Sequence, residues 1–374
     1  MANVISKGNL FPPEVTGEMI NKVRGKSSLA ALSDTEPVRF NGQAIFTFSL
    51  DKEVDVIAEN GAKSNGGATI GTVSMPPVKI EYGTRVSDEF MRASEDVRLQ
   101  YLRAFADGFA RKAARGLDIM AFHGFNPRTG SASNVIGTNH FDSQVTQAVS
   151  FTAATANDNV EAAIALVDAA EHEVTGMAMA PAMRAALGAL KRATNSNEPL
   201  FPELAWGNNP GTLNGLRTDT NATVSFNSSL DRAIVGNFRD FFRWGYASDI
   251  AFKVIEYGNP DNDATAGDLQ GHNQVYLRSE AYIGWAILDP TAFARIIASS
   301  LTLDKSTASV VAGSTTTLTA TTVPAGGTVT WTSSDTSIAT VAGGVVTGVA
   351  AGTATITASY MGLTAKATVT VTAQ

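Results

Sequence analysis

The side chains that could carry chemistry in this chain are few and scattered. It contains no cysteine and only four histidines, which excludes thiolate nucleophiles, disulfides and cysteine metal sites. His172 stands between Glu171 and Glu173, but successive residues of a helix point about 100° apart and cannot converge on one ion. A solvated helix face is therefore the expected environment of His172.

A second group of polar residues resembles part of a calcium loop. Residues 261–263 have the sequence Asp-Asn-Asp, and Asp268 follows. The glycine and the twelfth-position glutamate of a calcium loop are missing, so we interpret this stretch as a surface turn. Glycine loops that cradle phosphate, serine elbows and zinc-binding helices are also absent from the sequence. We expect no catalytic residue, no cofactor and no bound metal.

Composition excludes further classes of function. The chain has 374 residues and a formal net charge of −7, which argues against a protein that grips nucleic-acid phosphates directly. The first residues lack a basic segment followed by an apolar run, so we expect no signal peptide. No apolar stretch is long enough to span a membrane. We therefore expect a soluble protein made in a cytoplasm, without a membrane partner.

The chain is organised around residues 87–124, which predict one long amphipathic helix of roughly 50 Å. Gly124 would end it. The alternative is a helical hairpin broken near Ser94 or Gly108. Charged residues occupy the face of this helix that lies opposite its apolar stripe. The apolar stripe, at the spacing of one helix face, consists of Val97, Tyr101, Phe105, Phe109, Ala113, Leu117 and Met120.

The residues before this helix predict an arm and a hairpin. Residues 1–40 have a weak pattern and would lie across another part of the protein or a neighbour. Residues 43–50 predict a strand buried on both faces or nearly so, and residues 78–86 predict its antiparallel partner. Because residues 51–77 are too many for a tight turn, we expect a two-stranded arm that reaches away from its domain and needs a partner surface.

The middle of the chain mixes helices with short strands, which indicates an α+β body. Helices are expected after Asn157 and from Pro181, because proline favours the first turn. The expected strands cover residues 177–180, 222–226, 233–235, 250–255 and 274–285.

The composition changes at Leu301, after a linker at residues 298–300. Threonine dominates from there on and charged residues are rare. Alternating strands at residues 354–360 and 367–372, with glycine turns between, predict a small all-β sandwich. Its expected core residues are Trp331, Ile338, Val341, Ile356 and Val369.

Short phrases in a fixed order resemble the major capsid proteins of tailed double-stranded-DNA bacteriophages, whose shell fold is shared with encapsulins. One departure is Asn237, where the family usually has Asp. The phrases are residues 58–61 in the hairpin, 86–91 and 94–96 at the start of the long helix, 118–124 at its end, then 213–215, 233–238 and 274–293. Their order and spacing over most of the chain make the set specific.

This resemblance implies an α+β capsid shell domain over residues 1–299. Its parts would be an N-terminal arm (1–40), an extended loop laid over an adjacent subunit (51–77), a spine helix (87–124) in the peripheral domain and an axial domain (about 154–273). At the loop tip, Glu59, Asn60 and Lys63 become candidate contacts between subunits. The resemblance also offers an isopeptide crosslink from Lys52 or Lys63 to a neighbouring subunit, as some members of the family form; solvated contact lysines are the favoured interpretation.

The tail resembles bacterial immunoglobulin-like group 2 domains. The likeness rests on residues 330–335, 338–341 and 348–358. It implies an immunoglobulin-like sandwich over residues 300–374, with Trp331 as the core anchor in place of a disulfide.

The two resemblances together imply a structural protein rather than an enzyme. Pentamers and hexamers would form the icosahedral head of a phage, assembled in the host bacterial cytoplasm, with a portal and with DNA packaged inside without specific binding. The family's protease-removed scaffold segment does not precede the arm, so we expect a separate scaffold protein. The immunoglobulin-like domain would stand outside, binding surface glycans weakly or propping neighbouring capsomers.

Two other functions compete with this one. The alternative is an encapsulin-like nanocompartment shell that holds an enzyme cargo. A surface adhesin is disfavoured because no secretion signal is found.

Overall fold

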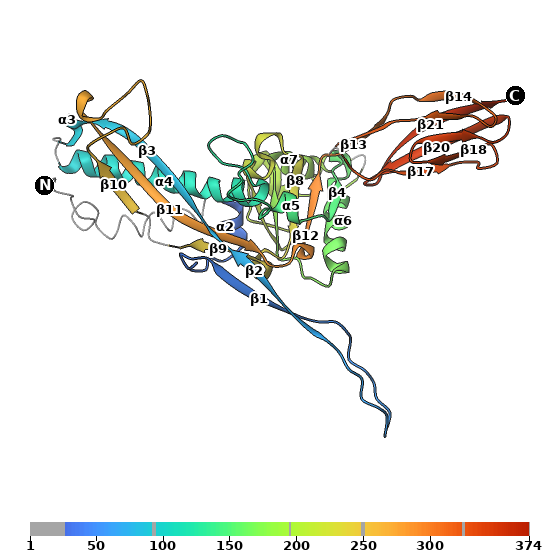
Figure 1. The fold of residues 1–374 in the computed structure, drawn as a ribbon, viewed down its shortest axis with the longest axis horizontal. Coiled ribbons are helices and arrows are strands. Elements are labelled where there is room, and N and C mark those ends of the chain that lie inside the picture. Colours follow the sequence, from blue (N-terminus) through green and yellow to red (C-terminus); the bar gives the residue numbers. More distant parts are fainter. Residues whose placement is uncertain (1–26, 92–94, 194–195, 248–250, 324–325, 374) are drawn as a thin grey trace.

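The computed structural model describes residues 27–91, 95–193, 196–247, 251–323 and 326–373, and for 90, 91, 95–101 and 251 it describes the backbone alone. The chain forms an elongated α+β body from which a thin hairpin projects, and an all-strand domain lies at the end opposite the long helix (Figure 1). The expected α+β class and the C-terminal sandwich are confirmed. No described helix is long and apolar enough to cross a membrane.

One end of the body consists of the long helix and a sheet beside it. The central strand of this sheet pairs with another strand along most of its length, from Gln274 opposite Ser87 to Gly284 opposite Pro77. The elements are β3 (Pro77–Ser87), α3 (Asp88–Met91), α4 (Glu95–His123), α8 (Phe238–Phe241), β9 (Phe242–Tyr246), β10 (Ala251–Ile255), η4 (Gln270–His272) and β11 (Gln274–Ile287). The sheet order is β10-β11-β3, with β9 paired to the far end of β11.

The predicted spine helix corresponds to α3 and α4. Helix α4 continues without a break through Gly108, so the hairpin alternative broken at that residue is wrong. The other proposed break, at Ser94, lies outside the described residues. The helix ends before Gly124, whose φ of +68° is the left-handed conformation that favours glycine at a helix end.

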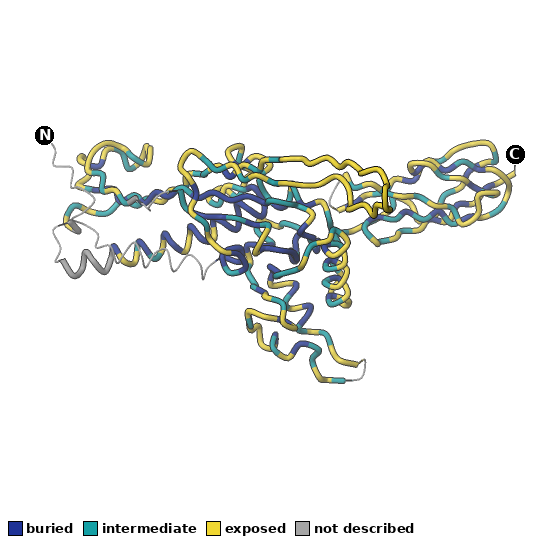
Figure 2. The backbone as a smooth tube through the Cα atoms, turned by 90° about the horizontal axis from the view of Figure 1, so that it is seen from below, coloured by how far each residue is buried: buried dark blue, intermediate teal, exposed yellow. Residues whose placement is uncertain are grey.

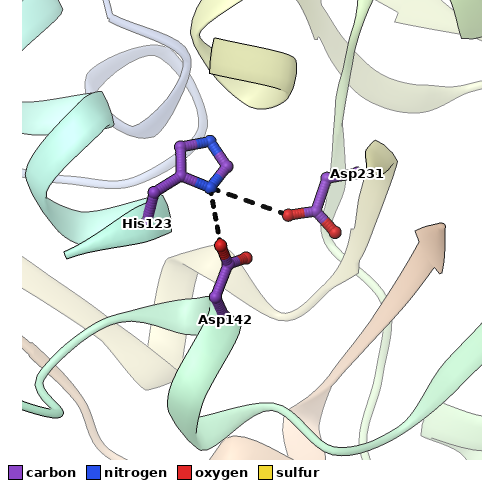
Figure 3. Close-up of side chains that lie close together, drawn as sticks. All are labelled: His123, Asp142 and Asp231. Carbon is purple, nitrogen blue, oxygen red and sulfur yellow. Dashed lines mark hydrogen bonds and ion pairs between the residues drawn. The ribbon is translucent and has the colours of Figure 1, made fainter. Parts of the chain in front are cut away.

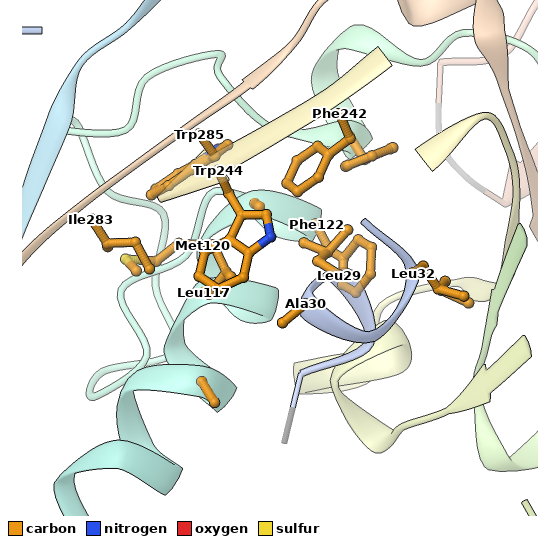
Figure 4. Close-up of a cluster of buried hydrophobic side chains, with 14 of the residues drawn as sticks. Leu29, Ala30, Leu32, Leu117, Met120, Phe122, Phe242, Trp244, Ile283 and Trp285 are labelled. Atoms are coloured by element: carbon orange, nitrogen blue, oxygen red, sulfur yellow. The ribbon is translucent and has the colours of Figure 1, made fainter. Parts of the chain in front are cut away.

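The core at the centre of the body combines α4 with a segment far earlier in the chain. Helix α2 (Ser28–Leu32) inserts Leu29 beside Phe122, and Leu32 on the other side of α2 is buried too (Figure 4). Trp244 and Trp285 belong to the same buried cluster. Leu29, Ala30 and Leu32 of α2 are therefore part of this subunit's own core. The expected arm over residues 1–40 would lie across another part of the protein or a neighbour, and for α2 that surface is the core of its own subunit. The first part of this arm, residues 1–26, lies outside the described residues.

The projecting hairpin pairs β1 (Gln43–Leu50) with β2 (Ala68–Met75), from Gln43 opposite Met75 to Leu50 opposite Ala68. The expected pairing of β1 with residues 78–86 is wrong, because those residues belong to β3 and pair with β11. The expectation that β1 is buried is also wrong, because every residue from 48 to 70 is exposed. Alternating apolar residues do not reveal whether the covering surface belongs to the same chain.

The middle of the body is a six-stranded sheet of order β4-β12-β8-β5-β7-β6. Helices α6 and α7 cover one face with Val167 and Leu187, against Met177 and Met179 of the central strand. The elements are α5 (Phe141–Gln144), β4 (Ala148–Ser150), η1 (Ala153–Thr155), α6 (Ala156–Ala169), β5 (Gly176–Met179), α7 (Pro181–Ala189), η2 (Pro202–Gly207), β6 (Thr212–Leu213), β7 (Leu216–Thr220), η3 (Ala222–Ser228), β8 (Asp231–Gly236), η5 (Pro290–Ala292) and β12 (Phe293–Ile297).

One strand expected in this region is not formed. Residues 222–226 lie in η3, a 3-10 segment that begins when the Asn221 side chain accepts a hydrogen bond from the Thr223 amide. Near its end, Asn227 has a φ of +52°. This turn chemistry competes with a strand despite the β-branched residues.

The C-terminal domain is a sandwich of short sheets with its own core. Ile356 and Val369 are fully buried at its centre. The strands are β13 (Ser300–Leu303), β14 (Thr307–Val311), β15 (Thr315–Thr317), β16 (Ala320–Val323), β17 (Thr330–Ser333), β18 (Ala339–Ala342), β19 (Val345–Gly348), β20 (Gly352–Tyr360) and β21 (Leu363–Thr372). The hydroxyl of Ser150 donates a hydrogen bond across to the Met361 carbonyl, which links the body to the turn between β20 and β21.

Candidate functional site

The loop that resembles a calcium site is closed around an arginine. The Arg85 guanidinium, from β3, donates to both carboxylate oxygens of Asp261 at 2.8 and 2.5 Å and to Asn259 Oδ1 at 2.7 Å. It also donates to the carbonyls of Ala266 and Gly267, at 3.1 and 2.9 Å. The hydrogen bond from Arg85 holds the pKa of Asp261 at about 2. These loop oxygens already accept hydrogen bonds from Arg85 and are not free to bind a cation, which fits a surface turn.

His172 does not occupy the expected helix face. Helix α6 ends at Ala169, and the histidine lies in the following turn, where Glu171 has a φ of +61°. Its Nε2 atom lies 3.3 Å from a carboxylate oxygen of Asp289 and 3.2 Å from the Thr291 hydroxyl. These contacts fix a turn, and neither flanking glutamate takes part in them.

Sequence reasoning missed a buried cluster at the junction of α4 with the six-stranded sheet (Figure 3). His123 Nδ1 lies 2.8 Å from Asp142 Oδ2 and 3.8 Å from Asp231 Oδ2. Arg295 donates to Asp142 at 2.7 Å and to Asp231 at 3.0 Å. Because the four residues come from α4, α5, β8 and β12, only the folded topology brings them together, and no local spacing signals the cluster.

The charges of this cluster depend on one another. His123 Nε2 lies 2.9 Å from the Thr223 carbonyl, which can only accept, so this nitrogen carries a proton. Burial lowers the pKa of His123, but the hydrogen bond and charge of Asp142 outweigh it and raise that pKa above its ordinary value. Burial also raises the pKa of Asp231, whereas contacts with His123 and Arg295 hold the pKa of Asp142 low despite its burial.

The ligand atoms of His123, Asp142 and Asp231 lie within 4.8 Å of one another, close enough to suggest a metal site. However, the guanidinium of Arg295 already binds both carboxylates, and a divalent cation beside it would meet a fixed positive charge. The donor set therefore does not suit a metal. It suits a buried ion-pair network that joins the long helix to the sheet.

The loop-tip residues Glu59, Asn60 and Lys63 are all exposed. Asn60 has a φ of +63° in a turn closed by the Gly61 amide, which donates to the Ala58 carbonyl at 2.8 Å. Lys52 donates to the Asn65 carbonyl across the loop. None of these interactions reaches the body, so the tip is held only by the hairpin itself.

One face of the hairpin is apolar and exposed, where the sequence predicts a buried strand. Phe48 lies opposite Ile70 in the strand register, and Phe46 and Leu50 flank Phe48 on the same face by alternation. These four side chains are 67–74% exposed. Val54, in the loop beyond, is 94% exposed. Contiguous apolar surface of this kind marks a contact site on a folded protein.

The predicted core positions divide into buried and half-buried ones. Of the helix stripe, Phe109, Leu117 and Met120 are buried, and Phe105 is half-buried against the rings of Tyr82 and Phe252. The side chains of Val97 and Tyr101 lie outside the described residues. In the C-terminal domain, Trp331, Ile338 and Val341 are partly buried and pack around the Ile356 and Val369 cluster.

Comparison with known proteins decides the family. The model of the phage capsid family matches residues 7–297. The chain belongs to the phage capsid family. A second family model, the bacterial Ig-like domain (group 2), matches residues 297–371. Both resemblances expected from the sequence are therefore confirmed.

Solved structures agree with this assignment. A chain from Mycobacterium phage Ogopogo is 30% identical with a TM-score of 0.62, covering 73% of this capsid protein and 92% of that chain. A chain from Gordonia phage Cozz is 23% identical with a TM-score of 0.61, covering 73% and 86%. One from Mycobacterium phage Bobi is 14% identical with a TM-score of 0.56, covering 80% and 95%. The last two show the fold alone. No curated protein sequence matches the chain.

The capsid protein is thus a structural component of the virion, with the phage capsid fold followed by an Ig-like domain. Its family is a structural one.

Proposed function

We propose that this capsid protein assembles into pentamers and hexamers that close into an icosahedral head around DNA. The observation that carries the proposal is the apolar face of the hairpin, defined by Phe46, Phe48, Leu50 and Ile70. A two-stranded ribbon is marginally stable alone, and its own subunit leaves this face about two thirds exposed. A neighbouring copy that receives the hairpin would cover it.

The free energy of such a contact is modest for one hairpin and large for a shell. Covering each of the four exposed side chains contributes about 1–2 kcal/mol before the cost of ordering the hairpin. Because every subunit both gives and receives a hairpin, weak contacts add up around a closed assembly. The exposed tip residues Glu59, Asn60 and Lys63 then contact the neighbour at the end of the same hairpin.

Other partners in the proposal follow from the family. A portal and a separate scaffold protein would take part in assembly within the host bacterial cytoplasm. Packaged DNA would fill the interior.

The Ig-like domain is proposed to stand on the outer surface and to bind carbohydrate weakly. It has a core of its own, and the exposed residues of β20 and β21 are mostly threonines, with Lys366 the charged residue among them. Such a surface offers hydroxyl donors and acceptors without strong charge, which suits polar sugars better than nucleic acid.

Electron microscopy of the purified protein tests the assembly. Closed shells with pentameric and hexameric capsomers are expected. If solution scattering showed only monomers at every salt concentration and pH, the proposed function would be wrong.

A further inference from the structure

The exposed face of α4 has a charge opposite to that of the whole chain. Within residues 102–123, the exposed charged side chains of this helix are Arg103, Arg111, Lys112 and Arg115. The acidic residues of the same stretch are the half-buried Asp107 and the fully buried Asp118. Four cations therefore share this face in a protein whose formal net charge is −7.

The cations form an open row around the exposed half of the helix. Arg103, Arg111 and Arg115 lie at multiples of four residues over about 18 Å, and each four-residue step turns about 40° further round the helix. Lys112 lies at the edge of this exposed half, and the half-buried Asp107 lies between Arg103 and Arg111. Along α4 the exposed residues alternate with buried ones, so one side of the helix is open to solvent (Figure 2). Only small residues, Ala104 and Gly108, are exposed between the cations, so a ligand backbone can approach closely.

The positive charge of this row is largely unneutralised by the chain itself. Arg115 is held over the ring of Phe226, 5.4 Å from its centre. In the described part of the chain, neither Arg103, Arg111 nor Lys112 forms an ion pair. These side chains remain available to an external polyanion.

We propose that this face of α4, defined by Arg103, Arg111, Lys112 and Arg115, binds the phosphate backbone of double-stranded DNA without sequence preference. The proposal rests on the proposed function, in which the shell encloses DNA, and adds that this face of α4 lines the interior. Arginine donors in a row match phosphate oxygens, and the face presents no carboxamide and no apolar wedge that reads bases. The contacts between this face and DNA phosphates are few and salt-sensitive, because the rest of the acidic chain repels DNA.

Fluorescence anisotropy of a short labelled DNA duplex, titrated with the purified full-length protein, tests the proposal. Three phosphate contacts predict that affinity falls about 40-fold between roughly 50 and 200 mM salt. The variant Arg103→Gln, Arg111→Gln, Lys112→Gln lowers the slope of log affinity against log salt by about 3. The matched control, Lys191→Gln, Lys305→Gln, Lys366→Gln, removes the same charge from exposed sites elsewhere and keeps the wild-type slope.

The outcomes separate this inference from the proposed function. Normal shells in micrographs of the triple α4 variant, together with weakened DNA binding, support both. Equal DNA affinity and slope in the α4 variant and the control overturn the inference while leaving shell assembly intact. Binding of poly-glutamate but not of duplex DNA also overturns it, since the face would then suit an acidic protein partner.

Discussion

The buried carboxylate of Asp118, near the C-terminal end of α4, accepts a hydrogen bond from the backbone amide of Ser28 at 3.0 Å. The same side chain accepts from the hydroxyls of Ser27 and Thr223 and from the Leu29 amide. One carboxylate thereby satisfies the free amides at the start of α2 and fastens that helix to the long one.

Asp118→Asn is therefore expected to destabilise the subunit by about 2–4 kcal/mol. The NH2 group of the new asparagine would face backbone amides or hydroxyls that now donate to the carboxylate. Buried donors would then be left without an acceptor. Chemical denaturation of the purified protein measures the change. Asp168→Asn, an exposed change on α6, serves as control, and equal stability of the two variants would contradict the anchoring role of Asp118.

The buried cluster predicts how stability depends on pH. The folded pKa of His123 is raised, so its contribution is present below the ordinary value of 6.5 and is lost as pH rises through the folded pKa. The raised pKa of Asp231 acts in the same direction. The lowered pKa of Asp142 acts oppositely, because its contribution is lost only as pH falls from about 4 toward 2.

We therefore expect the unfolding temperature to fall as pH rises from about 6 through neutral pH. His123→Gln removes the titrating ring and should flatten this decline, whereas His272→Gln, at an exposed position, should leave it unchanged. The measurement is differential scanning fluorimetry across this pH range. The same slope in both variants would show that the cluster does not set it.

The loop around Arg85 predicts a local effect. Arg85→Gln removes a guanidinium that bridges Asp261, Asn259 and two carbonyls. Residues 259–267 should then open, with faster hydrogen exchange at the Ala266 and Gly267 amides, while the core amides of β11 keep their protection. Unchanged exchange in this loop would mean that its own Asx turns suffice to hold it.

The apolar face of the hairpin predicts an assembly defect without a folding defect. Phe48→Ser combined with Ile70→Ser removes the central cross-strand pair, so each contact between subunits should weaken by about 2 kcal/mol or more. Circular dichroism should barely change, because neither side chain contributes to the subunit core. A matched variant on the opposite face, Thr47→Ser with Thr69→Ser, should form shells normally, and normal shells from both variants would refute the contact role.

The sequence predicts those helices and strands whose hydrophobic pattern is complete within one segment. It does not predict contacts with residues that are distant in the sequence or in another subunit. The period of α4 and the alternation of β20 and β21 are complete within each segment, so they could be recognised. The pairing of β1 could not, because its apolar residues face away from their own subunit. The cluster at His123 was equally hidden, since its members lie between positions 123 and 295 and meet only through the sheet order.

The last prediction concerns the Ig-like domain, which we expect to be dispensable for shell formation. The phage capsid family match ends at residue 297, and among the described residues the strands after it pair with one another and with no strand of the body. The link to the body rests on Ser150, which donates to the Met361 carbonyl and accepts from the Ser299 hydroxyl. Truncation after Ser299 should therefore leave the body folded.

Electron microscopy of the truncated protein should show shells of normal size, without the outer density of intact particles. Failure of the truncated shells to close would instead make the domain a clamp between capsomers. Glycan-array binding then tests the proposed display role, because many weakly binding copies on one particle give measurable avidity. Intact particles should retain bound sugars that truncated particles lose, and equal binding by the two would refute carbohydrate recognition by this domain.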